Sequence, residues 1–314
     1  MNILMVGHSG SGKTSFMAGL YKYVGEDNEG YDISSKNDVQ KKQLSRMATD
    51  LTRGRYPSGT DVQQKYEFAF TVAGHELMPF NWIDYRGGIL LSDDPDESDM
   101  NKFMKAIKNA DALVVFLDGE KLIQQGARWN MEYDILISCI ESSLSVSHNS
   151  WFPISFVITK CDMIPNGAKF YGLSRFHSLF SQIEKSKTVG AMLVQCAVTK
   201  DLYHIPFFVL AYSIYGGTPI YKNRCVEAYN AAIRRAEEHR PTSFLGQLFG
   251  GVEQLLSGIA GIVDMEWETE YDKTWAAEYT AQKQEQLFNQ LDACQNELKD
   301  KLMSWSEDDI VTIF

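Results

Sequence analysis

Eight residues near the start of the chain have the types and spacing of a phosphate-binding loop. Gly7 to Thr14 read GHSGSGKT, which fits the pattern G-x-x-x-x-G-K-[ST]. Glycines let the backbone curl so that successive N–H groups point inward, and the start of a following helix adds partial positive charge. Lys13 would then reach the β- and γ-phosphates of a nucleotide, and the Thr14 hydroxyl would bind Mg²⁺.

The residues that we expect to bind phosphate belong to this loop and to the first turn of the next helix. They are Gly7, Ser9, Gly10, Ser11, Gly12, Lys13, Thr14 and Ser15. His8 also lies in the loop, and we expect its side chain to point out of it rather than to touch phosphate.

A second motif follows an apolar stretch and supplies an acid. Asp84-Tyr85-Arg86-Gly87 fits D-x-x-G. An aspartate at a strand end can hold Mg²⁺ through water, as the Walker-B acid does. We therefore expect Asp84 to be a metal ligand and the Gly87 N–H to contact a γ-phosphate.

A third motif could select the base. Thr159-Lys160-Cys161-Asp162 fits [NT]-K-x-D after the apolar run 156–158. Guanine presents an N1–H beside an exocyclic amine, and one carboxylate can accept both hydrogen bonds, whereas adenine offers no such pair. Asp162 would accept these bonds, the apolar stem of Lys160 would cover the base, and Thr159 would tie this loop to the phosphate loop.

Strands that alternate with helices must position these motifs. Buried strands are predicted at 2–6, 112–117, 154–159 and 191–197, a hairpin at 65–72 and 76–84, and helices at 15–23, 34–51, 100–109, 131–144 and 173–185. This order is typical of an open, mostly parallel α/β sheet with one antiparallel hairpin strand and helices on both faces. Ligands of such sheets bind at the carboxyl ends of the strands, where all three motifs fall.

Composition narrows the class of partners. The 314 residues carry a net charge of −11, which argues against nucleic acid as a partner because phosphate neutralisation needs clustered Lys and Arg. The chain shows no signal peptide and no apolar run long enough to span a membrane, and its five widely spaced cysteines fit a reducing compartment. We expect a cytoplasmic protein.

The ordered motifs resemble those of the Ras-like P-loop GTPases related to translation factors. The resemblance covers about residues 1–200, and the long polar segment after the first helix is similar to a bacterial group of double-GTPase proteins. It implies a Ras-like P-loop NTPase fold that binds GTP or GDP with Mg²⁺. It also implies that Thr60, in a loop before the hairpin, binds Mg²⁺ and the γ-phosphate, so that Lys13, Thr60 and Arg86 would act in catalysis.

The chain departs from the family pattern at the last base-contacting motif. The family has Ser-Ala-Lys after the final strand, and here Cys196-Ala197-Val198 stands at that place. The Ala197 N–H can still donate to guanine, so Cys196 and Ala197 remain candidate base contacts, but the lysine is missing.

A second departure concerns hydrolysis. Many family members have Gln after D-x-x-G to orient the attacking water, and here the residue is Gly88. We therefore expect slow hydrolysis. Arg86, Arg53 and Arg55 are candidates to stabilise the transition state, and Gln63 and Gln64 are candidates to orient water.

Residues 201–314 do not follow the GTPase pattern, and we expect a helical C-terminal extension that packs on the first domain (1–200) or binds a partner. Residues 244–263 are apolar, amphipathic and rich in glycine, so they could lie in a membrane interface or dock into a partner groove. Their polar face lacks Lys and Arg, which argues against an anionic membrane, and their periodicity favours a helix packed on the core. Residues 272–305 are predicted to form a long helix, and the apolar tail 309–314 is predicted either to fill a groove or to stay free.

Three functions remain open from the sequence. The first is a Mg²⁺-dependent guanine-nucleotide switch that hydrolyses GTP slowly and acts on a protein effector or regulator. The second is a nucleotide-binding interaction module that does not hydrolyse, and the third, opposed by Thr159 to Asp162, is an ATP-dependent phosphotransferase.

Overall fold

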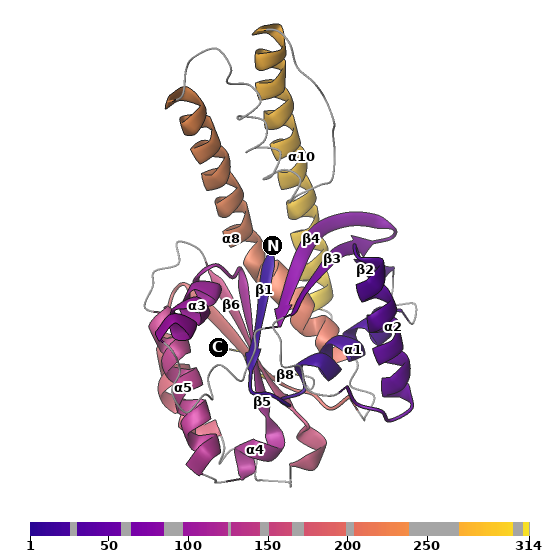
Figure 1. Cartoon of the computed structure of the whole chain (residues 1–314), viewed down its shortest axis with the longest axis vertical. Coiled ribbons are helices and arrows are strands. Elements are labelled where there is room, and N and C mark those ends of the chain that lie inside the picture. Colours follow the sequence, from indigo (N-terminus) through magenta and orange to yellow (C-terminus); the bar gives the residue numbers. More distant parts are fainter. Residues whose placement is uncertain are drawn as a thin grey trace.

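A computed structural model shows an α/β domain with two long C-terminal helices (Figure 1). It describes residues 1–25, 30–57, 64–84, 97–124, 127–144, 151–164, 173–198, 204–238, 270–303 and 310–313.

The described strands form one eight-stranded sheet in the order β2-β3-β4-β1-β5-β6-β7-β8. The strands are β1 (Asn2–Gly7), β2 (Tyr31–Ser35), β3 (Gln64–Val72), β4 (His75–Asp84), β5 (Ala112–Asp118), β6 (Phe152–Thr159), β7 (Val189–Gln195) and β8 (Ile310–Ile313). The central strands β4, β1, β5, β6 and β7 are parallel, and β3 and β4 form the predicted antiparallel hairpin.

Helices cover both faces of this sheet. They are α1 (Lys13–Val24), α2 (Asp38–Thr52), α3 (Glu97–Lys108), α4 (Gly119–Ile123), α5 (Ala127–Leu144), α7 (His177–Lys185), α8 (His204–Glu238) and α10 (Glu270–Met303), with 3₁₀ turns η2 (Cys161–Met163) and η3 (Ser174–Phe176). Successive side chains of β1 point to opposite faces of the sheet, so they pack into two separate hydrophobic cores. Ile3 and Met5 pack with α1, α8 and α10, whereas Leu4 and Val6 pack with α3, α5 and α7. The predicted fold class is confirmed.

The parallel arrangement brings the functional strand ends to one edge. Because β1, β4, β6 and β7 run in the same direction, their last residues Gly7, Asp84, Thr159 and Gln195 end on the same side of the sheet. The loops that carry the motifs leave the sheet at this edge, as the switch-point rule predicts.

Three features differ from the sequence prediction. Tyr31–Ser35 is a strand that pairs antiparallel with β3, where the sequence analysis predicts no strand and begins a helix at residue 34. Tyr31 and Ile33 are buried on one face, but five residues are too few for the alternation to stand out. No helix bounds are predicted above for residues 201–239, and the structure has one long helix there, α8, which contains Pro219.

The third difference is at the C-terminus. Residues 310–313 neither fill a groove nor stay free, since they pair antiparallel with Met192–Val194 of β7 and extend the sheet. The C-terminal extension is therefore not wholly helical. Pairing partners more than a hundred residues apart leave no trace in the local pattern, which is why the sequence could not assign this strand.

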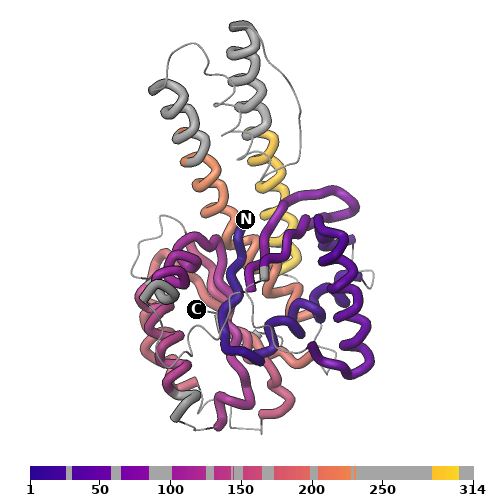
Figure 2. The backbone as a smooth tube through the Cα atoms, in the orientation of Figure 1, coloured from indigo at the N-terminus to yellow at the C-terminus, as the bar shows by residue number. Residues whose placement is uncertain are grey.

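In the parts that Figure 2 colours, the long helices α8 and α10 lie side by side and contact strands of the sheet. Leu291, Cys294 and Leu298 of α10 are fully buried in the same core as α1. Lys222 of α8 pairs with Asp292 of α10. These contacts join the C-terminal helices to the α/β domain.

The sequence analysis made two predictions about membranes, one for residues 244–263 and one for membrane-spanning segments. Residues 244–263 lie outside the described residues. Among the part of the chain that the structure describes, no helix is both long enough and apolar enough to cross a bilayer.

Candidate nucleotide-binding site

The backbone between β1 and α1 adopts a conformation that needs glycine. Gly10 and Gly12 have φ of 77° and 87°, in the left-handed region, and Gly12 precedes α1 without a side-chain cap. A Cβ on Gly12 would also lie 3.3 Å from Cγ2 of Thr159. The first N–H groups of α1 therefore stay available for an external anion, because no side chain caps them.

The Lys13 side chain lies within this curl. Its Nζ donates to the carbonyl oxygens of Gly7 and His8 at 2.9 and 3.0 Å and lies 3.8 Å from Oδ1 of Asp84. Burial lowers the pKa of Lys13, and Asp84 acts in the opposite direction. The loop thus places a cation beside the backbone N–H groups that would face a phosphate.

The loop after β6 is tied to the phosphate loop. The Thr159 hydroxyl donates to the carbonyl oxygen of Ser11 at 2.8 Å and lies 3.2 Å from that of Leu117. This is the connection that the sequence predicts for Thr159. It fixes the distance between the phosphate end and the base end of the candidate site.

The next residues of this loop are held by a side chain that sequence reasoning missed. The backbone of Lys160 adopts the left-handed conformation, with φ of 51°, and its Nζ donates to Oδ2 of Asp118 at 2.7 Å. Asp118 is fully buried at the end of β5, and its Oδ1 accepts from the N–H groups of Glu120 and Lys121, which caps α4. An acid at the end of a strand, as at Asp84, is the signal that could have indicated this residue.

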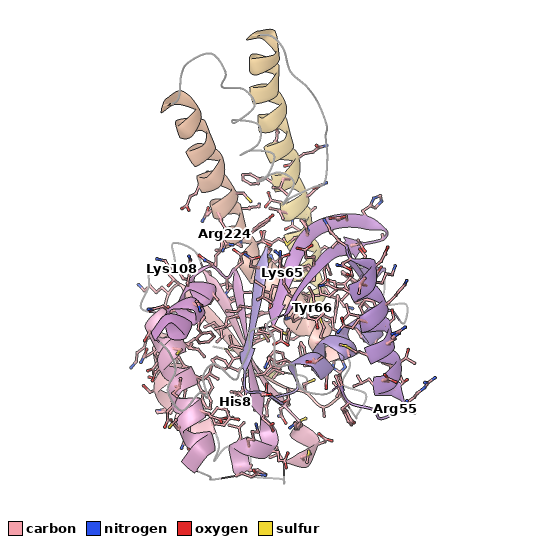
Figure 3. All side chains as sticks on the ribbon, viewed as in Figure 1. His8, Arg55, Lys65, Tyr66, Lys108 and Arg224 are labelled. Carbon is pink, nitrogen blue, oxygen red and sulfur yellow. The ribbon has the colours of Figure 1, made fainter. Side chains whose placement is uncertain are left out.

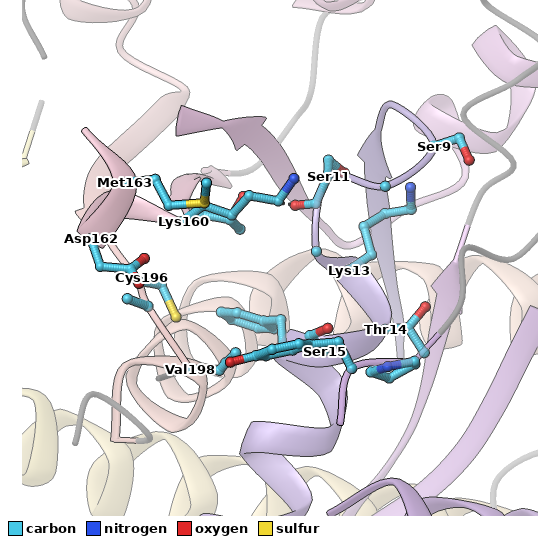
Figure 4. A pocket seen from close by; sticks show the side chains of 17 residues that line it. Ser9, Ser11, Lys13, Thr14, Ser15, Lys160, Asp162, Met163, Cys196 and Val198 are labelled. Carbon is cyan, nitrogen blue, oxygen red and sulfur yellow. Dashed lines mark hydrogen bonds between the residues drawn. The ribbon is translucent and has the colours of Figure 1, made fainter. Parts of the chain in front are cut away.

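A cavity of about 310 Å³ joins the two loops (Figure 4). Lys13 and Thr14 line one part of it, and Lys160, Asp162 and Ala197 line another. Its volume falls at the lower end of the range usual for small-ligand sites, about 300–1,000 Å³.

Most of the predicted contact residues meet around this cavity. Its lining includes Ser9, Gly10, Ser11, Gly12, Lys13, Thr14, Ser15, Thr159, Lys160, Asp162, Cys196 and Ala197. Cys196 is buried, and burial raises the pKa of its thiol. Gly7 begins the loop and accepts from Lys13, but it does not line the cavity. Tyr56 and Pro57 line it as well and were not predicted from sequence.

Some residues that the sequence singles out for catalysis or for contact with the γ-phosphate lie outside the described residues. They are Thr60, Gln63, Arg86 and Gly87, together with Gly88 at the place of the family's glutamine.

Of the arginines proposed for the transition state, Arg53 and Arg55 do not line the cavity. Both are exposed, and Arg55 pairs with Asp50 at 3.8 Å near the end of α2 (Figure 3). Lys121 is a further cation that the sequence did not single out, and its Nζ donates to the carbonyl oxygen of Ser9 at 3.3 Å.

The donors near Lys13 suit Mg²⁺ bound together with phosphate. The Thr14 hydroxyl and the buried Asp84 carboxylate are hard oxygen ligands. Among the described residues, no three His, Cys, Asp or Glu side chains gather into a metal-binding group.

A phosphate loop between β1 and α1 of a mostly parallel sheet, with a base-side loop after β6, defines a P-loop NTPase of Ras-like fold. Residues 4–152 match the family model Double-GTPase 1. This part of the chain is therefore similar to the double-GTPase family, and the sheet topology is that of a Ras-like P-loop NTPase. No curated protein is significantly similar to the chain in sequence.

Solved GTP-binding proteins show distant similarity. The SRb-GTP/SRX complex of the signal recognition particle receptor from Chaetomium thermophilum has a TM-score of 0.39 at 16% identity, covering 64% of this chain and 91% of that chain. A GTP-binding protein from Sulfolobus solfataricus in complex with GDP has a TM-score of 0.36 at 15% identity, covering 69% and 51%. The small GTPase Arl6 BBS3 from Trypanosoma brucei has 0.36 at 11%, covering 69% and 98%.

Proposed function

We propose that the protein is a Mg²⁺-dependent guanine-nucleotide switch that hydrolyses GTP slowly to GDP and phosphate. The observation that carries the proposal is the single cavity lined by Lys13 and Thr14 as well as by Asp162. A ligand with a phosphate chain and a purine needs both kinds of group in one cavity, and the Thr159–Ser11 hydrogen bond keeps the two loops in register.

Each part of the nucleotide has its own proposed partners. Loop N–H groups and Lys13 bind the phosphates, and Asp162 accepts two hydrogen bonds from guanine while Lys160 covers the base. Thr14 and Asp84 would hold Mg²⁺, which neutralises phosphate charge when bound.

The switch part of the proposal rests on the family and on the sequence of two loops. In Ras-like proteins a γ-phosphate orders two loops that are released on hydrolysis. Thr60 and Gly87 would contact that phosphate here, and a protein effector or regulator would recognise the ordered loops. With Gly88 in place of a glutamine, Arg86 is the proposed substitute that stabilises the transition state, and hydrolysis is slow.

Calorimetric titration with Mg²⁺ and GDP, a non-hydrolysable GTP analogue or ADP tests the binding part. We expect binding of both guanine nucleotides and none of ADP. Asp162→Asn should weaken GDP binding at least about 100-fold, since hydrogen bonds to a charged group contribute about 1.5–3 kcal/mol each, and should shift preference toward xanthine nucleotides. Asp134→Asn, an exposed change on α5, is the control. Equal binding of GDP and ADP, or an unchanged preference in Asp162→Asn, would reject guanine recognition.

The second candidate is a nucleotide-binding module that does not hydrolyse, which Gly88 favours. Single-turnover release of phosphate from GTP separates it from the switch. The switch predicts slow release that Arg86→Ala reduces further, whereas no release above a protein-free blank would leave the non-hydrolysing module.

A further inference from the structure

Behind the phosphate loop, two titratable side chains meet in the interior. The His8 side chain is fully buried and does not line the nucleotide cavity. Its Nδ1 lies 3.0 Å from Oε2 of Glu132, a residue of α5 that is only 1% exposed. The ring of Tyr133 meets the imidazole edge to face at 4.6 Å, and its hydroxyl donates to the carbonyl oxygen of Asp118.

The backbone of the same histidine holds the phosphate loop. The His8 carbonyl oxygen accepts from Lys13 Nζ at 3.0 Å and from the N–H of Ser11 at 3.2 Å. A rotation of this peptide would move both contacts. The side chain in the core and the carbonyl group in the loop belong to one residue, so the position of one constrains the position of the other.

The segment that provides Glu132 contacts the loop a second time. Lys121 of α4 donates to the carbonyl oxygen of Ser9 at 3.3 Å. Helices α4 and α5 both follow β5, and between them they contact consecutive residues, Ser9 and His8. One region of the chain, from α4 to α5, therefore contacts the loop at two consecutive residues.

The chemistry of the pair favours a role in conformation over a role in stability. Burial, then Lys121 and Lys13, lower the pKa of His8 to about 4, so the imidazole is uncharged at pH 7 and the contact is not an ion pair. A buried carboxyl group is costly to desolvate, and well-packed apolar residues in such a place are often as stable or more stable. Polar groups in a core can instead select one arrangement among several.

We infer that His8 and Glu132 are positioning residues for the nucleotide. Their contact holds the His8 peptide, and with it Lys13, in the orientation that receives phosphate, so that nucleotide affinity depends on α5. This inference rests on the proposed function and adds to it a control point outside the cavity.

The experiment separates affinity from stability. GDP binding with Mg²⁺ and unfolding in urea are measured for wild type, His8→Leu, Glu132→Leu and the double variant. We expect each single variant to bind GDP at least tenfold more weakly. We expect the double variant, with two apolar side chains facing each other, to recover the urea midpoint of wild type while its affinity stays at least tenfold reduced. Glu141→Leu, on the same helix and facing Gln182, is the control and should bind as wild type does.

Other outcomes overturn the inference. A double variant that binds GDP within threefold of wild type would show that the pair only fills space. If the leucine variants do not fold, Glu132→Gln replaces them, with the ¹⁵N shifts of the His8 imidazole recorded with and without GDP. Unchanged shifts in wild type, together with unchanged affinity in Glu132→Gln, reject the positioning role. If wild type does not bind GDP, the proposed function fails too, whereas wild-type binding with a fully active double variant rejects this inference alone.

Discussion

At the scale of single residues, burial decides the charge of His8. The residue lies inside the phosphate-loop motif, where the sequence predicts a side chain that points out of the loop. The structure places it in the protein interior beside Glu132. A motif specifies the backbone that curls around phosphate, but the environment behind that backbone depends on which helix packs there, and here it is α5.

Because His8 has a low pKa in the folded state, acid should destabilise the protein through this residue. Its pKa is lowered by burial to about 4 in the folded protein, against 6.5 for an ordinary histidine in the unfolded chain, so below pH 6.5 the unfolded chain binds a proton that the folded protein does not. The stability that neutral His8 contributes is complete above pH 6.5 and is lost as the pH falls to about 4. From pH 7 to 4.5 this loss is about 2–3 kcal/mol, at about 1.4 kcal/mol per pH unit.

Urea unfolding of wild type and His8→Gln at both pH values measures this term. Other titrating groups contribute to both proteins, so they cancel in the comparison. Wild type should lose about 2–3 kcal/mol more than the variant between pH 7 and 4.5. Equal losses would mean that His8 does not titrate in this range on folding.

At the scale of elements, the end of β5 links the base-side loop to α4. Asp118 caps the helix with one carboxylate oxygen and holds Lys160 with the other. The backbone at Gly119, the first residue of α4, packs closely against the base-side loop. A Cβ at this position would lie only 2.6 Å from the carbonyl oxygen of Thr159. The conformation of Lys160 therefore depends on a strand end that lies outside the recognised motif.

Asp118→Asn should weaken nucleotide binding without unfolding the protein. The amide oxygen can still cap α4, so the free energy of unfolding should change by less than about 1 kcal/mol. Loss of the charged hydrogen bond to Lys160 should lower GDP affinity about tenfold, corresponding to about 1.4 kcal/mol. Calorimetry and urea unfolding give the two values.

A neighbouring acid provides the control for this change. Glu120 lies 3.9 Å from Lys160 with a side chain that is 41% exposed, and Glu120→Gln should leave GDP affinity within twofold of wild type. A weaker GDP affinity in Glu120→Gln than in Asp118→Asn would contradict the role given to Asp118.

At the scale of the whole molecule, the C-terminal helices belong to the core of the α/β domain. Leu291 and Leu298 are fully buried against it, and the Tyr31 hydroxyl of β2 donates to Glu297 of α10 at 3.1 Å. The last strand, β8, completes one edge of the sheet. The domain boundary predicted near residue 200 stays a prediction. Such packing occurs both between two domains and within a single domain that includes the C-terminal helices.

Leu291→Ala distinguishes these two arrangements. Deleting a buried leucine side chain should cost about 2–5 kcal/mol. If α10 and the sheet unfold as one unit, the whole circular-dichroism transition in urea should move to lower concentration and remain single. Met303→Ala, at a side chain that is 79% exposed, should change stability by less than about 0.5 kcal/mol. An early separate transition that leaves the main midpoint unchanged would show that the C-terminal helices form an independent unit.

The sequence by itself determined the phosphate loop, the alternation of strands and helices, and the edge of the sheet where the motifs meet. Glycine spacing, short apolar runs and strand-end acids are local patterns, and local patterns can be recognised in the amino-acid sequence. The tertiary structure alone decided that Tyr31–Ser35 is a strand, that residues 310–313 pair with β7, that His8 contacts Glu132, and that Lys160 is the cation bound by the strand-end acid Asp118. These features depend on segments distant in sequence that burial and backbone hydrogen bonding bring together, so no local pattern records them.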